Sequence, residues 1–202
     1  MKLSKDHDRI MQLAAKRGLL RARDISGIST NPRVALSRLV ANGSLQKVSR
    51  GVYALPDRTR SSNHQYAEVA TRYPQATLCL LSALRFHQLT TQNPHEVWLA
   101  IPNKARMPQL DYPPLRVVRF SGPALTEGTE THKIDGVSVQ VYSVAKTVAD
   151  CFKFRNKIGL DVALEALREC SREKRATNDE IWRYAQICRV ANVIRPYLDS
   201  LE

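Results

Sequence analysis

The sequence lacks the patterns that mark membrane, secreted and disulfide-bonded proteins. No apolar run approaches the roughly 18 residues of a membrane-spanning helix, and no signal-peptide core or lipidation motif is present. The four cysteines are scattered, without a CxxC pair or the spacing of a zinc site, and are typical of small buried residues in a reducing compartment. These absences predict a cytoplasmic protein that does not associate with membranes.

The motifs of common catalytic and cofactor sites are also missing. There is no GxxxxGK(S/T) or GxGxxG loop for phosphates, no HxE-type zinc signature, and no Gly-Ser…DxD arrangement of a nucleotidyltransferase. None of the five histidines lies at metal-ligand spacing from another. Ser82 and His87 could be imagined as nucleophile and base, but their separation by five residues on one helix points them in different directions. We expect no catalytic residues, no metal and no cofactor.

What is present is an excess of basic residues at the N-terminal end. Of the net charge of +12, residues 1–60 contribute +9, from thirteen lysines and arginines against four acidic residues. The remaining 142 residues contribute only +3. A basic domain joined to a nearly neutral one favours a polyanionic partner, although charge alone leaves solubility as an alternative explanation.

The basic region predicts three helices in succession. The first is capped by Ser4 or Asp6 and ends at Gly18, and a shorter second helix spans residues 23–28. A third helix spans residues 32–41, because Asn31 is a favourable N-cap and Pro32 suits the first helical position.

The third helix has an apolar face and a polar face. The apolar stripe consists of Ala35, Leu36, Leu39 and Val40. Side chains of the kinds that reach phosphates and base edges lie off this stripe or at the helix entry, as in a recognition helix. They are Thr30, Asn31, Arg33, Ser37 and Arg38. The alternative is an ordinary helical hairpin with a solvated polar face.

A predicted hairpin follows the third helix and favours the DNA-binding interpretation. Residues 45–55 alternate between apolar and polar side chains, with a bend at Arg50 and Gly51. Three helices followed by a small basic hairpin is the order of a winged helix-turn-helix. Lys47 and Arg50 are then expected on the wing, where basic side chains add affinity and salt sensitivity more than sequence choice.

The rest of the chain predicts a second domain of the α+β class, with a small sheet packed by helices. Polar residues 58–63 form the expected linker, so we expect a DNA-binding domain over 1–57 and a second domain over 58–202. The predicted strands are 77–80, 96–101, 115–121 and 137–142, and the predicted helices are 64–73, 82–88, 144–154, 160–172, 177–188, and a last short helix bounded by Pro196. The 177–188 helix opens with the capping box Thr177–Glu180, and Trp98 and Trp182 are expected in the core.

Four segments, taken in order, resemble the AbiEi-type antitoxins of bacterial type IV toxin–antitoxin systems. They are RGLLRARDISGISTNPRVALSRLVANGSLQKVSRGVYAL, LSALRFHQLT, NPHEVWLAIP and VQVYSVAKTVADCFKFRNKIGLDVALEAL. The resemblance covers roughly residues 8–170 and is most distinctive at SRGVYAL and TVADCFKFRNKIG; residues 175–202 do not match it.

The resemblance implies a transcriptional autorepressor that binds inverted repeats of double-stranded DNA in its own promoter. It also implies that the second domain counteracts a nucleotidyltransferase-type toxin without a stable complex. Inverted repeats require two copies on DNA, either as monomers that bind cooperatively or as a weak dimer. Carried over by position, the residues that the resemblance implies as DNA contacts remain those of the third helix and its entry, with Lys47, Ser49 and Arg50 on the wing.

The resemblance also draws attention to a polar group in the second domain. Lys146 and Asp150 are four residues apart, so residue spacing alone predicts a surface ion pair of little energetic weight. The resemblance instead favours a working antitoxin surface, formed by Lys146, Thr147, Asp150, Lys153, Arg155 and Asn156.

Two other functions stay open at this point. One is a winged-helix transcription factor whose second domain senses a small molecule or a protein. The other is a nuclease or transferase, against which the lack of clustered carboxylates argues.

Overall fold

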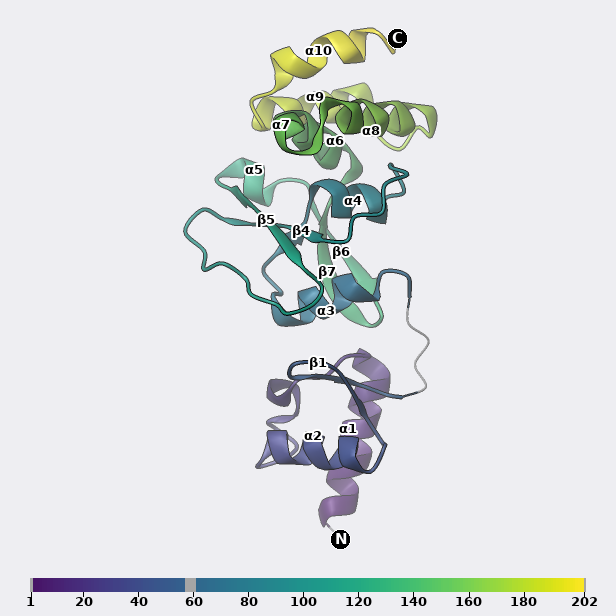
Figure 1. Cartoon of the computed structure of the whole chain (residues 1–202), viewed down its shortest axis with the longest axis vertical. Helices are drawn as coiled ribbons and strands as arrows, with labels where there is room; N and C mark the ends of the chain where they lie inside the picture. Colours follow the sequence, from purple (N-terminus) through teal and green to yellow (C-terminus); the bar gives the residue numbers. More distant parts are fainter. Residues whose placement is uncertain (1, 57–60, 202) are drawn as a thin grey trace. The chain divides into compact units, whose positions relative to one another are not determined.

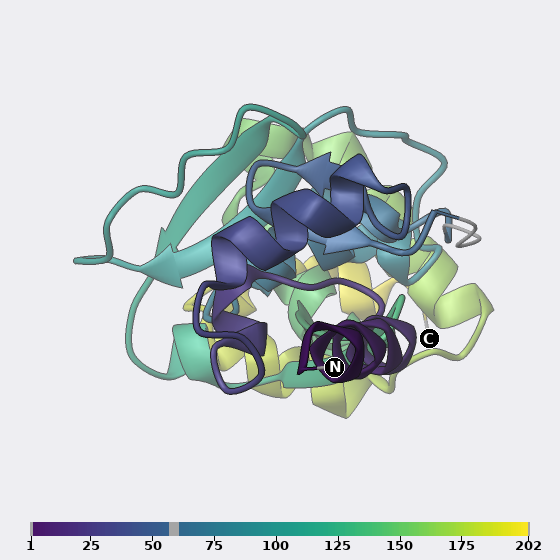
Figure 2. The ribbon, with the colours of Figure 1, turned by 90° about the horizontal axis from the view of Figure 1, so that it is seen from below.

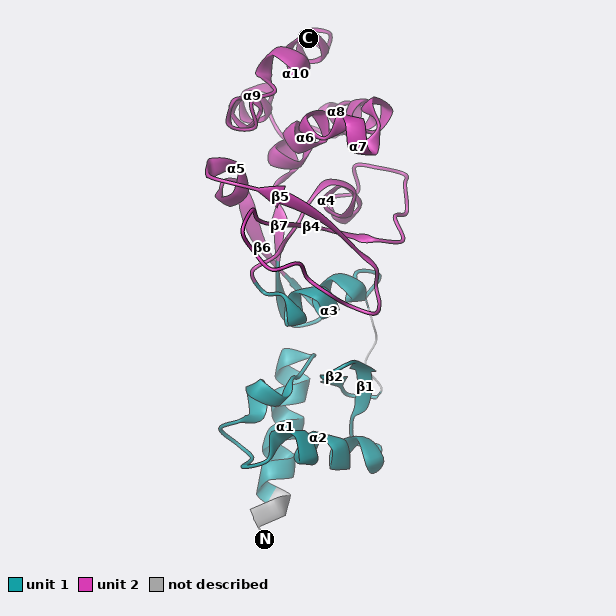
Figure 3. Cartoon of the chain, turned by 60° about the vertical axis from the view of Figure 1, so that its left-hand side comes forward, with its two compact units in different colours: residues 1–74, 133–139 teal, residues 75–132, 140–202 magenta. Residues whose placement is uncertain are grey.

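The computed structural model describes residues 2–56 and 61–201 and divides into two compact units (Figures 1 and 3). The first unit consists of residues 1–74 and 133–139, and the second of residues 75–132 and 140–202. The predicted domain boundary after residue 57 and the linker residues 58–60 lie outside the described residues. The helix of residues 64–72 groups with the N-terminal unit.

The first unit begins with three helical segments in the predicted order. These are α1 (Lys2–Arg17), the 3₁₀ helix η1 (Ala22–Ile25) and α2 (Pro32–Ala41). In Figure 2, α1 is seen nearly end-on, whereas α2 is seen from the side. Because α1 begins at Lys2, the prediction that Ser4 or Asp6 caps it is wrong. The bounds of α2 are those predicted, whereas η1 is shorter than the helix expected there.

The predicted wing is present as an antiparallel pair of strands. It consists of β1 (Gln46–Ser49) and β2 (Val52–Ala54), with Gly51 in the turn at a φ of 77°, a conformation that favours glycine. Leu20 and Tyr53 exchange backbone hydrogen bonds of 2.8 and 2.9 Å, which join the segment before η1 to the wing. The order of these elements confirms the winged helix-turn-helix fold.

Apolar side chains from α1, η1, α2 and the segments beside them meet in one core. The two helices contribute the inner face of α2 and one stripe of α1, while η1 contributes a single isoleucine. The fully or nearly fully buried members are Ile10, Ala14, Leu20, Ile25, Leu36, Leu39 and Leu45. Burial of this set holds α2 by its apolar face and leaves its polar face toward solvent. The unit also contains α3 (His64–Arg72).

A mixed five-stranded sheet follows, in the order β5-β4-β3-β7-β6. β3 (Thr77–Leu78) pairs antiparallel to β4 (Val97–Pro102) and parallel to β7 (Val137–Tyr142), and β4 pairs parallel to β5 (Leu115–Phe120). These four strands confirm the predicted ones to within a few residues. The edge strand β6 (Thr129–Ile134) was not predicted, because its sequence TETHKI is mostly polar and exposed.

The remaining helices all belong to the second unit, with α6 central among them. They are α4 (Leu80–Phe86), α5 (Pro123–Thr126), α6 (Val144–Lys153), α7 (Arg155–Ile158), α8 (Leu160–Arg172), α9 (Asn178–Ile187) and α10 (Ala191–Asp199). Buried residues of α6, α8, α9 and α10 share one core, which includes Trp98 and packs against Trp182. The α+β fold class is therefore confirmed. No helix within the described residues is long and apolar enough to cross a membrane.

The ends of α9 and α10 show one correct and one wrong prediction. Thr177 and Glu180 form the predicted capping box, in which the Thr177 hydroxyl accepts from the backbone N–H of Glu180 at 3.2 Å. Pro196, however, lies inside α10 and does not bound it. Proline there is exposed, while Ile194 and Leu198 are buried in the core, so burial of the opposite face keeps the helix continuous.

Candidate nucleic-acid interface

The solvent side of α2 carries a continuous exposed stripe. Along the helix, Leu36 and Leu39 are 0% and 5% exposed, which fixes the opposite side toward solvent. The exposed residues of the helix are Arg33, Val34, Ser37, Arg38 and Ala41. The predicted residues of α2 therefore lie together on one face, as a recognition helix requires.

The entry to α2 adds two exposed polar side chains to this face. Asn31 occupies the N-cap position, but its side chain makes no capping hydrogen bond. Its backbone N–H instead donates to the hydroxyl of Ser29 at 3.3 Å. Thr30 is also exposed. The polar groups of Thr30 and Asn31 are thus presented at the N-terminal end of α2, the part of a recognition helix that approaches base edges.

A hollow of about 470 Å³ lies between the start of α1 and α2. Thr30, Asn31, Val34 and Arg38 line it from the α2 side. Sequence analysis missed Val34, whose side chain is 42% exposed although it is apolar. The signal available in the sequence was its spacing, since Val34 lies one turn from both Thr30 and Arg38 and outside the buried stripe.

The wing presents the other predicted group. Lys47 and Arg50 are exposed, and Ser49 is half-buried beside the turn. Among interactions between described residues, none pairs Arg33, Arg38, Lys47 or Arg50 with a carboxylate. Four exposed cations without an acidic partner give the domain a positive surface suited to a polyanion.

The polar group predicted on α6 is in a different environment from the one expected. Lys146, Thr147 and Asp150 are all 0% exposed, so the expectations of a surface ion pair and of an antitoxin surface at these three positions are wrong. The reason is the central position of α6, which contacts α4, α8 and α9 and is buried on several sides. Only Lys153 and Asn156, which are exposed, and the half-buried Arg155 remain available to a partner.

Lys146 and Asp150 form a closed buried cluster. Nζ of Lys146 lies 2.5 Å from Oδ2 of Asp150 and 4.1 Å from the ring centroid of Tyr142. The Cys188 thiol donates to Oδ1 of Asp150 at 3.2 Å. Burial raises the pKa of Asp150, and Lys146 opposes that shift; burial and the Asp150 charge raise the pKa of Cys188 to about 12. The carboxylate is satisfied on both oxygens, as in a structural ion pair.

The described residues bring no other candidate centre together. The Ser82 hydroxyl accepts from the backbone N–H of Trp98 at 2.8 Å, whereas Nε2 of His87 lies 2.7 Å from the carbonyl oxygen of Tyr142. The two side chains therefore have separate partners. No group of three or more metal-ligating side chains occurs within the described part of the chain.

Comparison with known proteins supports a regulatory class. The family model described as "Transcriptional regulator, AbiEi antitoxin" matches residues 8–56, which run from α1 through the wing and confirm the resemblance over this region. The crystal structure of the RV2827C protein from Mycobacterium tuberculosis is similar with a TM-score of 0.55 and 13% identity, covering 98% of this chain and 80% of that one. That likeness concerns the fold alone. No curated protein sequence matches the chain.

Proposed function

We propose that this chain is a DNA-binding autorepressor and the antitoxin of a type IV toxin–antitoxin system. In this proposal residues 1–57 bind inverted repeats in the chain's own promoter. Residues 58–202 counteract a nucleotidyltransferase-type toxin, without a stable complex between the two proteins. The chain binds DNA as a monomer or weak dimer, with cooperativity between two copies. The family match over residues 8–56 supports the general class, an antitoxin and transcriptional regulator.

The observation that carries the proposal is the exposed face of α2. Arg33 and Arg38 are solvent-exposed on α2, and the side-chain amide of Asn31 makes no capping hydrogen bond. Arginine is the commonest partner of guanine, asparagine pairs with adenine, and serine or threonine is permissive. Arg33, Ser37 and Arg38, with Thr30 and Asn31 at the entry, therefore read base edges in the major groove.

The wing supplies contacts of a second kind. Lys47, Ser49 and Arg50 lie on a short hairpin whose turn is open to solvent. Contacts from a wing to phosphates position the protein on the duplex and carry little sequence information. The division of labour is then specificity from α2 and salt-dependent affinity from the wing.

The antitoxin role rests on the second domain and on a smaller set of residues than the sequence indicated. Lys153, Arg155 and Asn156, at the end of α6 and in α7, are the part of the predicted polar patch that can meet a partner. The function is regulatory, not enzymatic. In support, the carboxylate of Asp150 is engaged by Lys146 and Cys188, leaving it unsuited to act as a base.

DNA binding is tested by footprinting the full chain on the DNA upstream of its own gene. We expect two protected half-sites in inverted orientation. The variant Arg33→Ala with Arg38→Ala should lose specific binding, since each bidentate arginine contact is worth about 1–3 kcal/mol of discrimination. Arg168→Ala with Arg195→Ala is the matched control, because it removes two exposed arginines from α8 and α10 in the other unit. Unchanged specific binding by the double variant would contradict the assignment of α2.

The antitoxin role is tested by co-expression with a neighbouring nucleotidyltransferase gene. Growth should be rescued by the wild-type chain and by the Arg33→Ala, Arg38→Ala variant, because repression and neutralisation reside in different domains. Failure of the wild-type chain to rescue growth, together with intact operator binding, would favour a transcription factor whose second domain senses a small molecule or a protein.

A further inference from the structure

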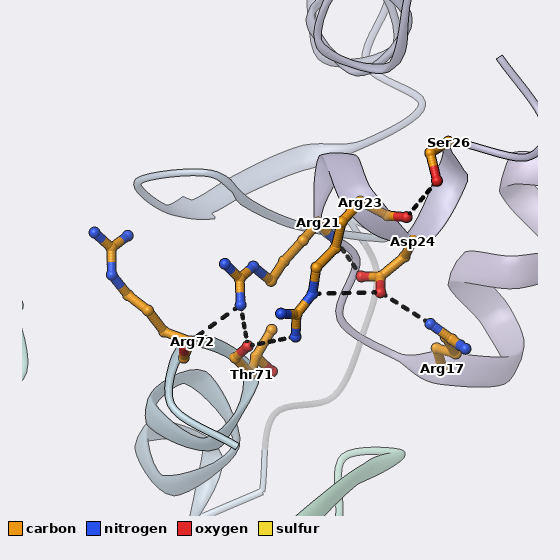
Figure 4. Close-up of polar contacts among 7 residues, drawn as sticks. All are labelled: Arg17, Arg21, Arg23, Asp24, Ser26, Thr71 and Arg72. Atoms are coloured by element: carbon orange, nitrogen blue, oxygen red, sulfur yellow. Dashed lines mark hydrogen bonds and ion pairs between the residues drawn. The ribbon is translucent and has the colours of Figure 1, made fainter. Parts of the chain in front are cut away.

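The C-terminal turn of α3 accepts hydrogen bonds from arginines that precede the wing (Figure 4). Nη1 of Arg21 donates to the carbonyl oxygen of Thr71 at 2.6 Å and to that of Arg72 at 3.4 Å, and Nη2 of Arg23 reaches Thr71 at 3.5 Å. The last carbonyls of a helix have no partner within the helix and carry partial negative charge. The arginines therefore satisfy acceptors that have no partner within the helix.

Arg21 is also tied to the DNA-binding elements through its backbone. Its N–H donates to Oδ2 of Asp24 at 2.7 Å, which closes the start of η1. The preceding residue, Leu20, is paired with Tyr53 of β2. Burial, together with the nearby charge of Arg23, lowers the pKa of Arg21, but a guanidinium remains protonated near neutral pH. Arg21 thus reaches α3 through its side chain and η1 through its backbone, and it directly follows the residue that pairs with the wing.

A second arginine connects α3 with the turn of the wing. Nη1 of Arg72 donates to the backbone carbonyl oxygen of Arg50 at 3.0 Å. Arg50 is one of the proposed phosphate contacts, and it precedes Gly51 at the bend between the strands. Arg72 therefore holds the backbone of the wing turn while the Arg50 side chain stays exposed.

We propose that the C-terminal turn of α3 is the anchor of the winged domain, and that Arg72 and Arg21 are positioning residues for DNA binding. The inference rests on the proposed function, which it extends to residues beyond the 1–57 segment. A short hairpin of two strands is only marginally ordered by itself. Binding is stronger when the contacting element is already held in its bound conformation, because less conformational entropy is lost. Arg72 supplies this order without touching DNA.

The experiment compares Arg72→Ala and Arg72→Lys in the full chain with the wild type. The first measurement is amide hydrogen exchange without DNA, at Val52, Tyr53 and Ala54 of β2. Exchange should be severalfold faster in Arg72→Ala and close to wild type in Arg72→Lys, since lysine retains a donor for the Arg50 carbonyl. Arg168→Ala is the charge-matched control and should leave exchange in the wing unchanged.

The second measurement is affinity for a labelled duplex from upstream of the chain's own gene, over a range of salt concentrations. Arg72→Ala should bind about fivefold more weakly, the effect of one net hydrogen bond, and Arg72→Lys should restore most of the loss. The slope of log affinity against log salt should not change for Arg72→Ala, whereas Arg50→Ala should lower it by about one, the value for a lost phosphate contact.

The two measurements separate the inference from the function on which it rests. Wild-type exchange rates in Arg72→Ala would overturn the anchor, whatever the DNA result. A salt slope that falls by about one in Arg72→Ala would also overturn it, because Arg72 would then contact phosphate directly. Failure of the wild-type chain to bind any duplex would instead overturn the proposed function, and the exchange rates would still decide the anchor.

Discussion

Nζ of Lys146 lies 2.5 Å from Oδ2 of Asp150, with both side chains fully buried at the centre of the second unit. Nζ of Lys146 lies over the rings of Tyr142 and Phe120, at 4.1 and 4.9 Å from the ring centroids. The Cys188 thiol donates a hydrogen bond to the other carboxylate oxygen, Oδ1 of Asp150. Both charges have thus given up their hydration and depend on each other and on these neighbours.

Removal of one partner should therefore be far more damaging than removal of both. Lys146→Met leaves the Asp150 carboxylate buried without a counter-charge and should cost about 3–5 kcal/mol of unfolding free energy. Lys146→Met with Asp150→Leu should recover most of this loss, because an apolar pair of similar volume needs no hydration. Both tryptophans lie in the second unit, so denaturant unfolding followed by tryptophan fluorescence reports this unit. A single variant within about 1 kcal/mol of wild type would contradict the prediction.

His87 should make the second unit sensitive to mild acid. Burial lowers the pKa of His87, while its Nε2 lies 2.7 Å from the carbonyl oxygen of Tyr142. The folded state then binds the proton less tightly than the unfolded chain, so stability is present above the ordinary histidine pKa of about 6.5 and is lost as pH falls through the folded value.

The corresponding measurement is the unfolding free energy of wild type, His87→Gln and His95→Gln between about pH 7 and pH 5. His87→Gln should show a shallower decline than wild type, since glutamine retains an amide donor and does not titrate. His95 is exposed and serves as the control, so its variant should follow the wild-type curve. Parallel curves for all three proteins would show that His87 does not control the acid response.

Val34 should contribute to sequence choice through thymine. It is an exposed apolar side chain on the same face as Arg38, and thymine offers the C5-methyl group as an apolar contact in the major groove. Replacing the contacted thymine by deoxyuracil removes only this methyl group. We expect about fourfold weaker binding by wild type, the effect of one buried methyl group, and little change for Val34→Ala.

The measurement is a scan in which each thymine of the protected half-site is replaced in turn. One or two positions should distinguish wild type from Val34→Ala, and thymines outside the footprint provide the baseline. Equal responses of the two proteins at every position would place Val34 away from the bases.

The wing should govern salt dependence without changing specificity. Lys47→Ala and Arg50→Ala each remove an exposed cation, and each should lower the salt slope by about one on both specific and random duplexes. In Arg50→Ala the backbone carbonyl that accepts from Arg72 is retained, so the effect isolates the side chain. Titrations at several salt concentrations measure the slope. A loss confined to the specific duplex would mean that these side chains read bases.

Local signals explain which elements were predictable. Pro32 at the first helical position marks the start of α2, and the Thr177–Glu180 capping box marks the start of α9, because both signals act within one turn of helix. Strand β7 was predicted with the bounds that the structure gives. Strand β6 was not predicted, although Asp135 and Gly136 form its hairpin turn with positive φ values of 52° and 79°. An edge strand pairs on only one side, and the mostly polar side chains of β6 give no apolar pattern by which to predict it.

The exposed face of α2 was determined by the sequence itself, since the apolar stripe of an amphipathic helix decides which residues stay exposed. The burial of Lys146 and Asp150 was not determined by the sequence, because their spacing indicates an ion pair equally well at the surface or in the core. Only the packing of α4, α8 and α9 around α6 places that pair out of water. The same holds for Arg72, which lies 22 residues from Arg50 in the chain. Contacts between distant segments depend on how their helices pack, and residue spacing alone does not predict that packing.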